Sequence, residues 1–114
     1  MRFMITIYDN DDSAAAYTGE FREEHQRIHG EVQEELKASG ELVDTQVLSV
    51  TEAKVVRVHD GSPGITDGPF TEGRELVGGY YIVDCATIDR ALDIASRFIE
   101  ARFAPIEVRA LVAD

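Results

Sequence analysis

The chain has 114 residues, of which 44% are hydrophobic, and its 22 Asp and Glu residues outnumber 11 Lys and Arg residues to give a formal net charge of -11. This length predicts a single domain over residues 1–114, and the negative charge repels phosphate backbones and anionic membranes, which argues against direct nucleic-acid or membrane binding. The lone cysteine excludes an intrachain disulfide, and the short apolar run near the N-terminus predicts neither a signal peptide nor a membrane span, so we expect a cytoplasmic protein.

The first part of the chain predicts a strand followed by a long helix. Phe3–Tyr8 is rich in β-branched and aromatic residues, which is typical of a buried strand. From Glu20 to Ser39 the apolar residues recur at helical spacing, and Gly40 stands where helix C-termini commonly close. The recurring apolar positions are Phe21, Ile28, Val32 and Leu36.

The rest of the chain predicts four strands and a second helix. The expected strands are Leu42–Val50, Lys54–His59, Tyr80–Cys85 and Ile106–Val112. Asp60-Gly61 predicts a turn from the second of these into a short hairpin. Thr87 is the expected N-cap of the helix. The apolar stripe of this helix would comprise Ile88, Ala91, Leu92, Ala95, Phe98 and Ile99.

The order of these elements predicts an α+β fold. The series β-α-β-β-β-α-β reduces to the ferredoxin-like split β-α-β with an antiparallel sheet and a small extra hairpin. Two helices should cover one face of the sheet. Because the other face also carries apolar residues, we expect a second copy of the chain to cover it and the protein to be a homodimer.

A tight loop is predicted at Asp67-Gly68-Pro69-Phe70. Gly68 can adopt a positive φ, Pro69 restrains the backbone, and we expect Phe70 to anchor the loop on the core. Asp67 can accept hydrogen bonds from the N–H groups of the turn. The loop is then either a turn alone or the rim of a pocket, in which case Asp67 and Arg74 would bind substrate.

His25 is the leading candidate for a catalytic residue. At 100° per residue it falls within the apolar arc of the long helix, so it should point toward the sheet. A neighbouring carboxylate would fix one tautomer of the imidazole and suit it to acid–base work. Asp9, at the end of the first strand, is the expected partner. The alternatives are a core histidine bonded to a backbone carbonyl and an aspartate in a solvated loop.

Further candidates lie around this pair. His29 follows His25 at i+4, a spacing that can bind a metal, but no H-E-x-x-H motif and no third ligand are evident, so we expect no metal site. Gly78-Gly79 matches neither a dinucleotide-binding nor a phosphate-binding loop, so we expect no cofactor. His29 is instead a candidate for substrate binding.

Arginine and tyrosine side chains complete the expected site. Arg22 and Arg74 could bind an anionic substrate, or could pair with surface carboxylates. Tyr80 and Tyr81 point to opposite faces of one strand, so at most one can face a site, and we take Tyr80 as the substrate-binding candidate. On the alternative interpretation both tyrosines serve packing.

Several of these motifs together resemble a known family. Asp67–Phe70, continued by Thr71–Tyr81, resembles the DGPF-type branch of the YCII-related proteins. Ile7–Asp9 and Arg22–His25 are similar to the Asp after the first strand and the R-x-x-H of the first helix in that family. Glu107–Arg109 resembles its closing E-V-R-P motif. The resemblance covers essentially the whole chain.

The chain also departs from the family pattern. Gly73-Arg74 replaces the usual Thr-Lys, and Ala110 stands where proline is usual. The resemblance implies a dimer of ferredoxin-like subunits packed sheet to sheet and a His/Asp-centred active site.

Two functional hypotheses follow from the resemblance. Related YCII-type proteins include a dehydrochlorinase of chlorinated hydroxyquinols, which makes a cofactor-independent lyase or isomerase acting on a small aromatic substrate one hypothesis. DGPF-type genes often lie beside alternative sigma factors, so a non-catalytic binding or regulatory protein is the other.

Overall fold

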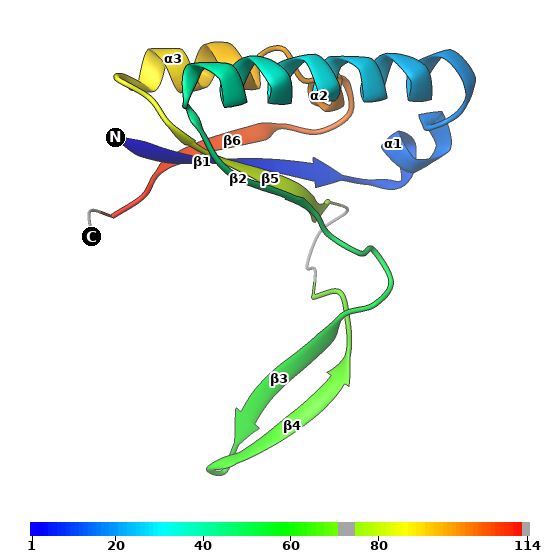
Figure 1. Ribbon diagram of the computed structural model, residues 1–114. Coiled ribbons are helices and arrows are strands. Elements are labelled where there is room, and N and C mark those ends of the chain that lie inside the picture. The colour runs from blue at the N-terminus through cyan, green and yellow to red at the C-terminus, as the bar shows by residue number, and fades with distance from the viewer. Residues whose placement is uncertain (71–74, 113–114) are drawn as a thin grey trace.

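The computed structural model describes residues 1–70 and 75–112. Figure 1 shows a layer of helices on a sheet, with a hairpin that projects away from both. The elements in chain order are β1 (Arg2–Asp9), α1 (Asp11–Ala16), α2 (Gly19–Ser39), β2 (Leu42–Val47), β3 (Lys54–His59), β4 (Ser62–Asp67), β5 (Leu76–Asp84), α3 (Ile88–Ala95), the 3₁₀ helix η1 (Ile99–Arg102) and β6 (Ile106–Ala110).

Four strands form an antiparallel sheet in the order β2-β5-β1-β6, and β3 pairs only with β4. Without the hairpin and α1, the order β-α-β-β-α-β is the ferredoxin-like arrangement. Helices α2 and α3 lie over the same face of the sheet (Figure 1). The structure thus confirms the predicted α+β fold with a four-stranded antiparallel sheet and a separate hairpin. None of the described helices combines the length and the apolar character that crossing a bilayer requires.

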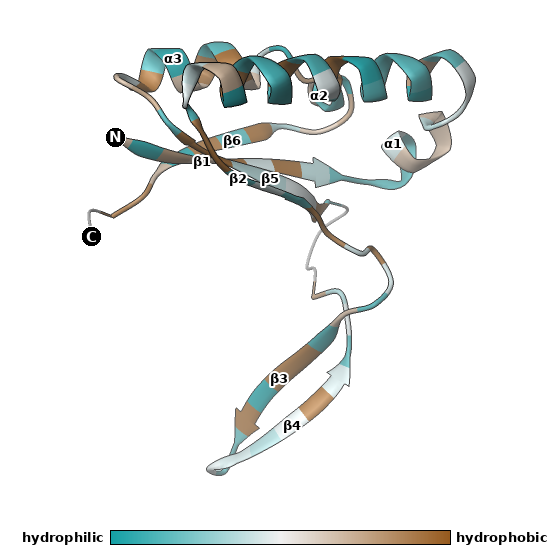
Figure 2. Cartoon of the chain, viewed as in Figure 1, coloured by the Kyte–Doolittle hydropathy of each residue, from teal (hydrophilic) through white to brown (hydrophobic). Residues whose placement is uncertain are grey.

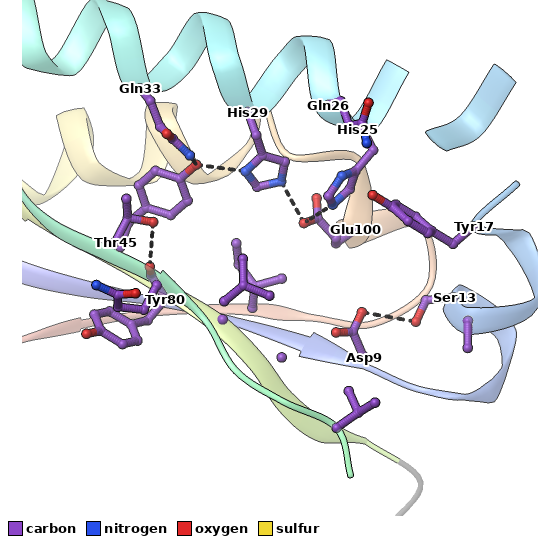
Figure 3. A pocket seen from close by; sticks show the side chains of 18 of the residues that line it. Asp9, Ser13, Tyr17, His25, Gln26, His29, Gln33, Thr45, Tyr80 and Glu100 are labelled. Carbon is purple, nitrogen blue, oxygen red and sulfur yellow. Dashed lines mark hydrogen bonds and ion pairs between the residues drawn. The ribbon is translucent and has the colours of Figure 1, made fainter. Parts of the chain in front are cut away.

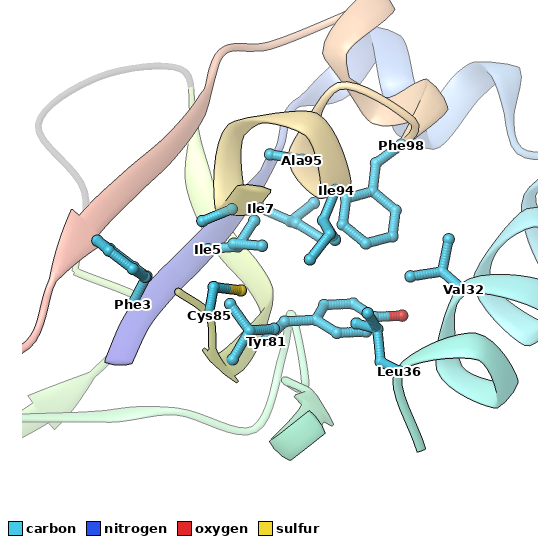
Figure 4. Close-up of a cluster of buried hydrophobic side chains, with 12 residues drawn as sticks. Phe3, Ile5, Ile7, Val32, Leu36, Tyr81, Cys85, Ile94, Ala95 and Phe98 are labelled. Carbon is cyan, nitrogen blue, oxygen red and sulfur yellow. The ribbon is translucent and has the colours of Figure 1, made fainter. Parts of the chain in front are cut away.

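The core lies between the helices and the inner face of the sheet (Figure 4). Because side chains alternate along a strand, every second residue of β1 points into it. The fully buried side chains include Phe3 and Ile5 of β1, Val32 and Leu36 of α2, Val83 of β5, Ile94 of α3, and Phe98. These contacts hold the inner face of α2 over the centre of the sheet.

The predicted length of the second helix was wrong. Thr87 is the N-cap, as expected, and its hydroxyl accepts a hydrogen bond from the Arg90 N–H, but α3 ends at Ala95 instead of continuing to Ile99. Ile88 and Leu92 of the expected stripe are exposed, whereas Ile94 is fully buried. The chain bends after α3, because Phe98 and Ile99 reach the core through an extended residue and a 3₁₀ turn.

Strand limits also differ from the sequence prediction. β2 ends at Val47 and β6 at Ala110, which is earlier than expected, and β5 begins at Leu76. Helix α1 was not predicted. Its capping box explains why so short a segment is helical, since Asn10 Oδ1 accepts from the Ser13 N–H at 2.9 Å and Ser13 Oγ accepts from the Asn10 N–H at 3.0 Å.

The hairpin confirms the predicted turn. Asp60 and Gly61 both have a positive φ, at 50° and 77°, as a tight two-residue hairpin loop requires. Val56 and Ile65 face each other across the two strands, and both are exposed. Figure 2 shows hydrophobic positions on both strands of the hairpin. An isolated two-stranded hairpin is marginally stable in water, so this apolar surface is a candidate for contact with another molecule.

The loop at Asp67–Phe70 differs from expectation. The described glycines with a positive φ are Gly19, Gly40 and Gly61, so Gly68 is required for another reason: a Cβ there would lie 3.1 Å from Val55 Cγ2. Phe70 is 58% exposed, so it does not anchor the loop on the core. The guanidinium carbon of Arg57 lies 5.2 Å from the centroid of the Phe70 ring.

An ion pair fastens α3 to the turn after α2 and makes stability depend on pH. Arg90 donates to both carboxylate oxygens of Glu41, at 2.9 and 3.0 Å. Hydrogen bonds from Arg90 lower the pKa of Glu41 from 4.5 to about 2, although burial opposes the shift. Because the folded-state pKa is the lower one, this stabilisation is complete above about pH 4.5 and is lost as the pH falls toward 2.

We therefore expect Glu41→Gln to lower the free energy of unfolding at pH 7 by about 1–3 kcal/mol. Urea titrations between pH 7 and pH 2 should show the difference from the wild type shrinking as the wild-type carboxylate protonates. Glu107→Gln, in a solvent-exposed pair with Arg109, is the control and should cost less than about 1 kcal/mol. A difference that stays constant with pH would contradict this assignment.

Candidate functional site

A pocket of about 700 Å³ lies between the first half of α2 and one end of the sheet. Figure 3 shows α2 on one side of it, with β1 and β5 on the other. Its aromatic walls include Tyr17, Phe21 and Tyr81. Its ionisable side chains include Asp9, His25, His29 and Glu100. A small, largely apolar molecule with one or two polar groups would match this lining.

Two histidines of α2 meet one buried carboxylate in this pocket. His25 and His29 are one helical turn apart and share the inward side of the helix, as their spacing predicts. Nε2 of His25 lies 3.0 Å from Glu100 Oε2, and Nε2 of His29 lies 2.7 Å from the same oxygen (Figure 3). Glu100 is only 6% exposed. We call these three residues the histidine–glutamate cluster.

Glu100 reaches the cluster because of the bend after α3. Phe98 and Ile99 are buried in the core, and η1 begins directly after Phe98. Glu100 was not among the predicted site residues, because it follows Ile99, the last residue of the expected apolar stripe, and His29 lies 71 residues away. The only local sign in the sequence was a glutamate directly after the two large apolar residues Phe98 and Ile99.

The cluster favours the ionised form of Glu100. Burial by itself raises the pKa of this carboxyl group, but hydrogen bonds from His25 and His29, together with the charge of His29, lower it from 4.5 to about 2. The hydrogen bonds therefore outweigh desolvation. Each imidazole presents its Nε2 to the carboxylate. Because an ionised carboxylate only accepts hydrogen bonds, Nε2 of each ring carries the proton that it donates.

Tyr81 supports the cluster from the sheet. Its hydroxyl lies 2.7 Å from His29 Nδ1 and accepts a hydrogen bond from Gln33 Nε2 at 3.0 Å. Burial raises the pKa of Tyr81, so its hydroxyl keeps its proton. The ring of Phe98 stacks on that of His29, with centroids 4.6 Å apart. His29 is thus held on both ring nitrogens and on one face.

Asp9 lines the same pocket but does not hold His25. Its carboxylate accepts a hydrogen bond from Ser13 Oγ at 3.2 Å, and the carboxylate in contact with His25 belongs to Glu100 instead (Figure 3). Burial raises the pKa of Asp9, the Ser13 hydrogen bond opposes this, the charge of Glu100 adds to it, and His25 lowers it. The unpredicted helix α1 accounts for the difference, because it supplies Ser13.

Gly78 lets Asp9 take this position. A Cβ on Gly78 would lie 1.8 Å from Asp9 Oδ2, so any other residue must push the carboxylate away. With Asp9 unchanged, we expect Gly78→Ala to lower the free energy of unfolding by about 1–3 kcal/mol. Gly30→Ala is the control in the same pocket, since a Cβ there meets nothing within 4 Å.

The control Gly30→Ala should instead raise the free energy of unfolding, because alanine stabilises a helix interior by about 0.5–1 kcal/mol relative to glycine. Urea denaturation of both variants measures the two effects. A Gly78→Ala variant as stable as the wild type would show that Asp9 does not pack closely against β5.

Of the other predicted site residues, Arg22 and Asp67 lie away from the pocket and Tyr80 lies at its border. Arg22 is exposed and its guanidinium lies 6.0 Å from the ring centroid of Tyr17, while Asp67 forms an ion pair with Lys54 on the hairpin. Tyr80 borders the pocket, but its hydroxyl donates to Asp44 at 2.6 Å and its ring lies on the face opposite to Tyr81. The tyrosine that contacts a histidine is therefore Tyr81.

Arg74, the remaining predicted substrate-binding residue, lies outside the described residues. Around the pocket, the structure brings together His25, His29, Asp9 and Tyr80 from the predicted set. It adds Glu100, Tyr81, Gln33 and Ser13 through their hydrogen bonds.

The fold and the pocket define a small α+β domain with ionisable side chains gathered beneath its long helix. Residues 1–112 match the family model of the YCII-related domain. The chain therefore belongs to the YCII-related family. It is also similar to an uncharacterized protein of Rhizobium meliloti (strain 1021), with 31% identity over 96 residues, which is 83% of this chain and 77% of that protein.

Proposed function

We propose that this protein transfers protons on a small, flat, largely apolar substrate, as a lyase or isomerase of the cofactor-independent kind. The observation that carries the proposal is the histidine–glutamate cluster in the wall of an aromatic-lined pocket. A buried carboxylate that bonds one nitrogen of an imidazole leaves the other nitrogen to exchange a proton. Aromatic walls favour an aromatic or phenolic substrate.

His25 is the residue that we assign to proton transfer. Both ring nitrogens of His29 have partners, whereas Nδ1 of His25 is buried without one among the described residues. The ring of Tyr17 covers His25 edge-on, with centroids 5.0 Å apart. Tyr17 is partly exposed, so we expect its ring to move when substrate enters and to let the substrate reach Nδ1.

Asp9 supplies a second acid–base group on the opposite wall. Its pKa is raised by burial, while that of Glu100 is lowered by the histidines. Environments that separate the pKa values of two carboxyl groups are typical of sites where one group carries a proton and the other stays charged. In this scheme His25 takes a proton from the substrate, and Asp9 gives one to a second position or to a leaving group.

The proposal is tested with small phenols and hydroxyquinols, first by thermal shift and then for turnover. His25→Ala should lower the turnover of any compound that reacts by about 10²–10⁴-fold. His59→Ala, which removes an exposed histidine on the hairpin, should leave it unchanged. Turnover that survives in His25→Ala would overturn the assignment. If no compound shifts the melting temperature and the protein instead retains a sigma factor, the regulatory alternative holds.

We further propose that the chain belongs to the DGPF-type branch of its family and forms a homodimer. Asp67–Phe70 supports the first proposal. The second is supported by the sheet face opposite the helices, where Met4, Tyr80 and Ile82 are partly exposed, and by the apolar surface of the hairpin. Light scattering should give twice the mass of one chain. Ile82→Lys should reduce this mass if the sheet faces meet, and Ile65→Lys should do so if the hairpins meet.

A further inference from the structure

We propose that the histidine–glutamate cluster binds one Zn²⁺ ion per chain. The ligand atoms would be Nε2 of His25, Nε2 of His29 and a carboxylate oxygen of Glu100. One possible ligand atom from each of these residues lies within 4.8 Å of those of the other two. Two imidazoles and a carboxylate form one of the ligand sets found for catalytic zinc. The inference concerns the same residues as the proposed function but does not depend on proton transfer taking place.

The geometry is close to what the ion needs. Zinc bonds of about 2.0–2.1 Å place tetrahedral ligand atoms about 3.3 Å apart. Oε2 of Glu100 lies 3.0 and 2.7 Å from the two Nε2 atoms, so the carboxylate needs to withdraw by a few tenths of an ångström. The i, i+4 spacing on α2 already directs both imidazoles to one point, as in helical zinc motifs.

Two further observations point to a ligand at this place. Glu100 Oε1 is buried in a residue that is only 6% exposed, and it has no hydrogen-bond partner among the described residues. A carboxylate that binds an ion by one or both oxygens would use this atom. In addition, His29 Nδ1 lies 2.7 Å from the Tyr81 hydroxyl, an outer contact of the kind that orients metal-binding histidines.

Three protein ligands leave a fourth position of the ion open. All three side chains line the pocket, so a small molecule or water can reach that position. When Nε2 of His25 binds zinc, Nδ1 of the same ring carries the proton and cannot accept one from a substrate, so zinc binding and proton transfer by His25 exclude each other. Zinc binding would then switch the site from a state that can transfer protons to a metal-bound state that cannot.

The test is isothermal titration of Zn²⁺ into the full chain after treatment with a chelator, and titration of Co²⁺ with its visible spectrum as a second readout. We expect one ion per chain with a dissociation constant in the micromolar range or below, and a spectrum typical of tetrahedral cobalt. His29→Ala and Glu100→Gln should each weaken binding at least tenfold. Tyr81→Phe keeps the aromatic ring and removes only the contact between its hydroxyl and His29. It therefore tests the contribution of that contact to zinc binding with little risk to folding.

His59→Ala is the matched control, because its imidazole is exposed on the hairpin. If His59→Ala abolishes binding while His29→Ala does not, or if the chain takes up no Zn²⁺, the proposal is overturned. Turnover is measured on the chelator-treated protein alone. A metal-free protein that is active but never binds Zn²⁺ removes only this inference, and one that binds Zn²⁺ but shows no turnover when metal-free removes only the proposed function.

Discussion

Replacing Glu100 by glutamine should lower the free energy of unfolding by about 3 kcal/mol at pH 7, the equivalent of a pKa lowered from 4.5 to about 2. The environment stabilises the carboxylate more than burial penalises it, so removing the charge is a net loss. The neutral amide also turns one acceptor oxygen into a donor toward imidazoles that already donate. Urea denaturation measures the loss of stability.

The chain offers a matched control for this change. Glu24 forms an exposed ion pair with Arg102 at 3.1 Å, and Glu24→Gln should cost less than about 1 kcal/mol. NMR of the imidazole nitrogens separates the local cause from a general loss of packing, because His25 and His29 should change tautomer populations in Glu100→Gln and not in Glu24→Gln. Equal stability of Glu100→Gln and the wild type would show that the cost of burying the carboxylate cancels the gain from its hydrogen bonds to the histidines.

Replacing Phe98 by alanine should cost about 3–5 kcal/mol, the largest expected effect of any single substitution considered for this chain. Phe98 is fully buried, and its ring stacks on His29 and lies 4.8 Å from the ring of Tyr81. The same side chain therefore fills the core and supports one wall of the site. We expect the loss of stability to be accompanied by greater mobility of His29.

Two other variants separate these roles. Phe98→Leu keeps most of the buried volume, so it should cost less than about 1.5 kcal/mol, yet it removes the stacked ring. Phe70→Ala, at an exposed phenylalanine, should stay within about 0.5 kcal/mol of the wild type. Thermal denaturation orders the three variants, and a large effect of Phe70→Ala would show that the hairpin end is packed against another surface in solution.

The elements with a clear repeating pattern were predicted well. The apolar positions of α2 recur at helical spacing, and its end at Gly40 follows from the left-handed φ of 79° that glycine tolerates. The turn at Asp60-Gly61 was predicted for a similar reason. In contrast, α1 is too short to show a period, and its helical conformation depends on the Asn10–Ser13 capping box and a hydrogen bond from Asn10 Nδ2 to the Phe103 carbonyl.

The site was predicted only in part, because local and distant contacts carry different information. The spacing of His25 and His29 placed both on the inward side of α2, since a helix repeats every 3.6 residues. The carboxylate they share comes from Glu100, which is 75 residues from His25 and enters the pocket only because the chain bends after α3.

The order of the four sheet strands and of helices α2 and α3, the inward side of α2 and the two imidazoles on it follow from the sequence alone, because these features depend on neighbours within a few residues. Only the tertiary structure shows which acid meets those imidazoles, and that Tyr81 and not Tyr80 supports them. Those choices depend on how the sheet, α1 and the bend before η1 pack together, and no local pattern of side chains encodes that packing.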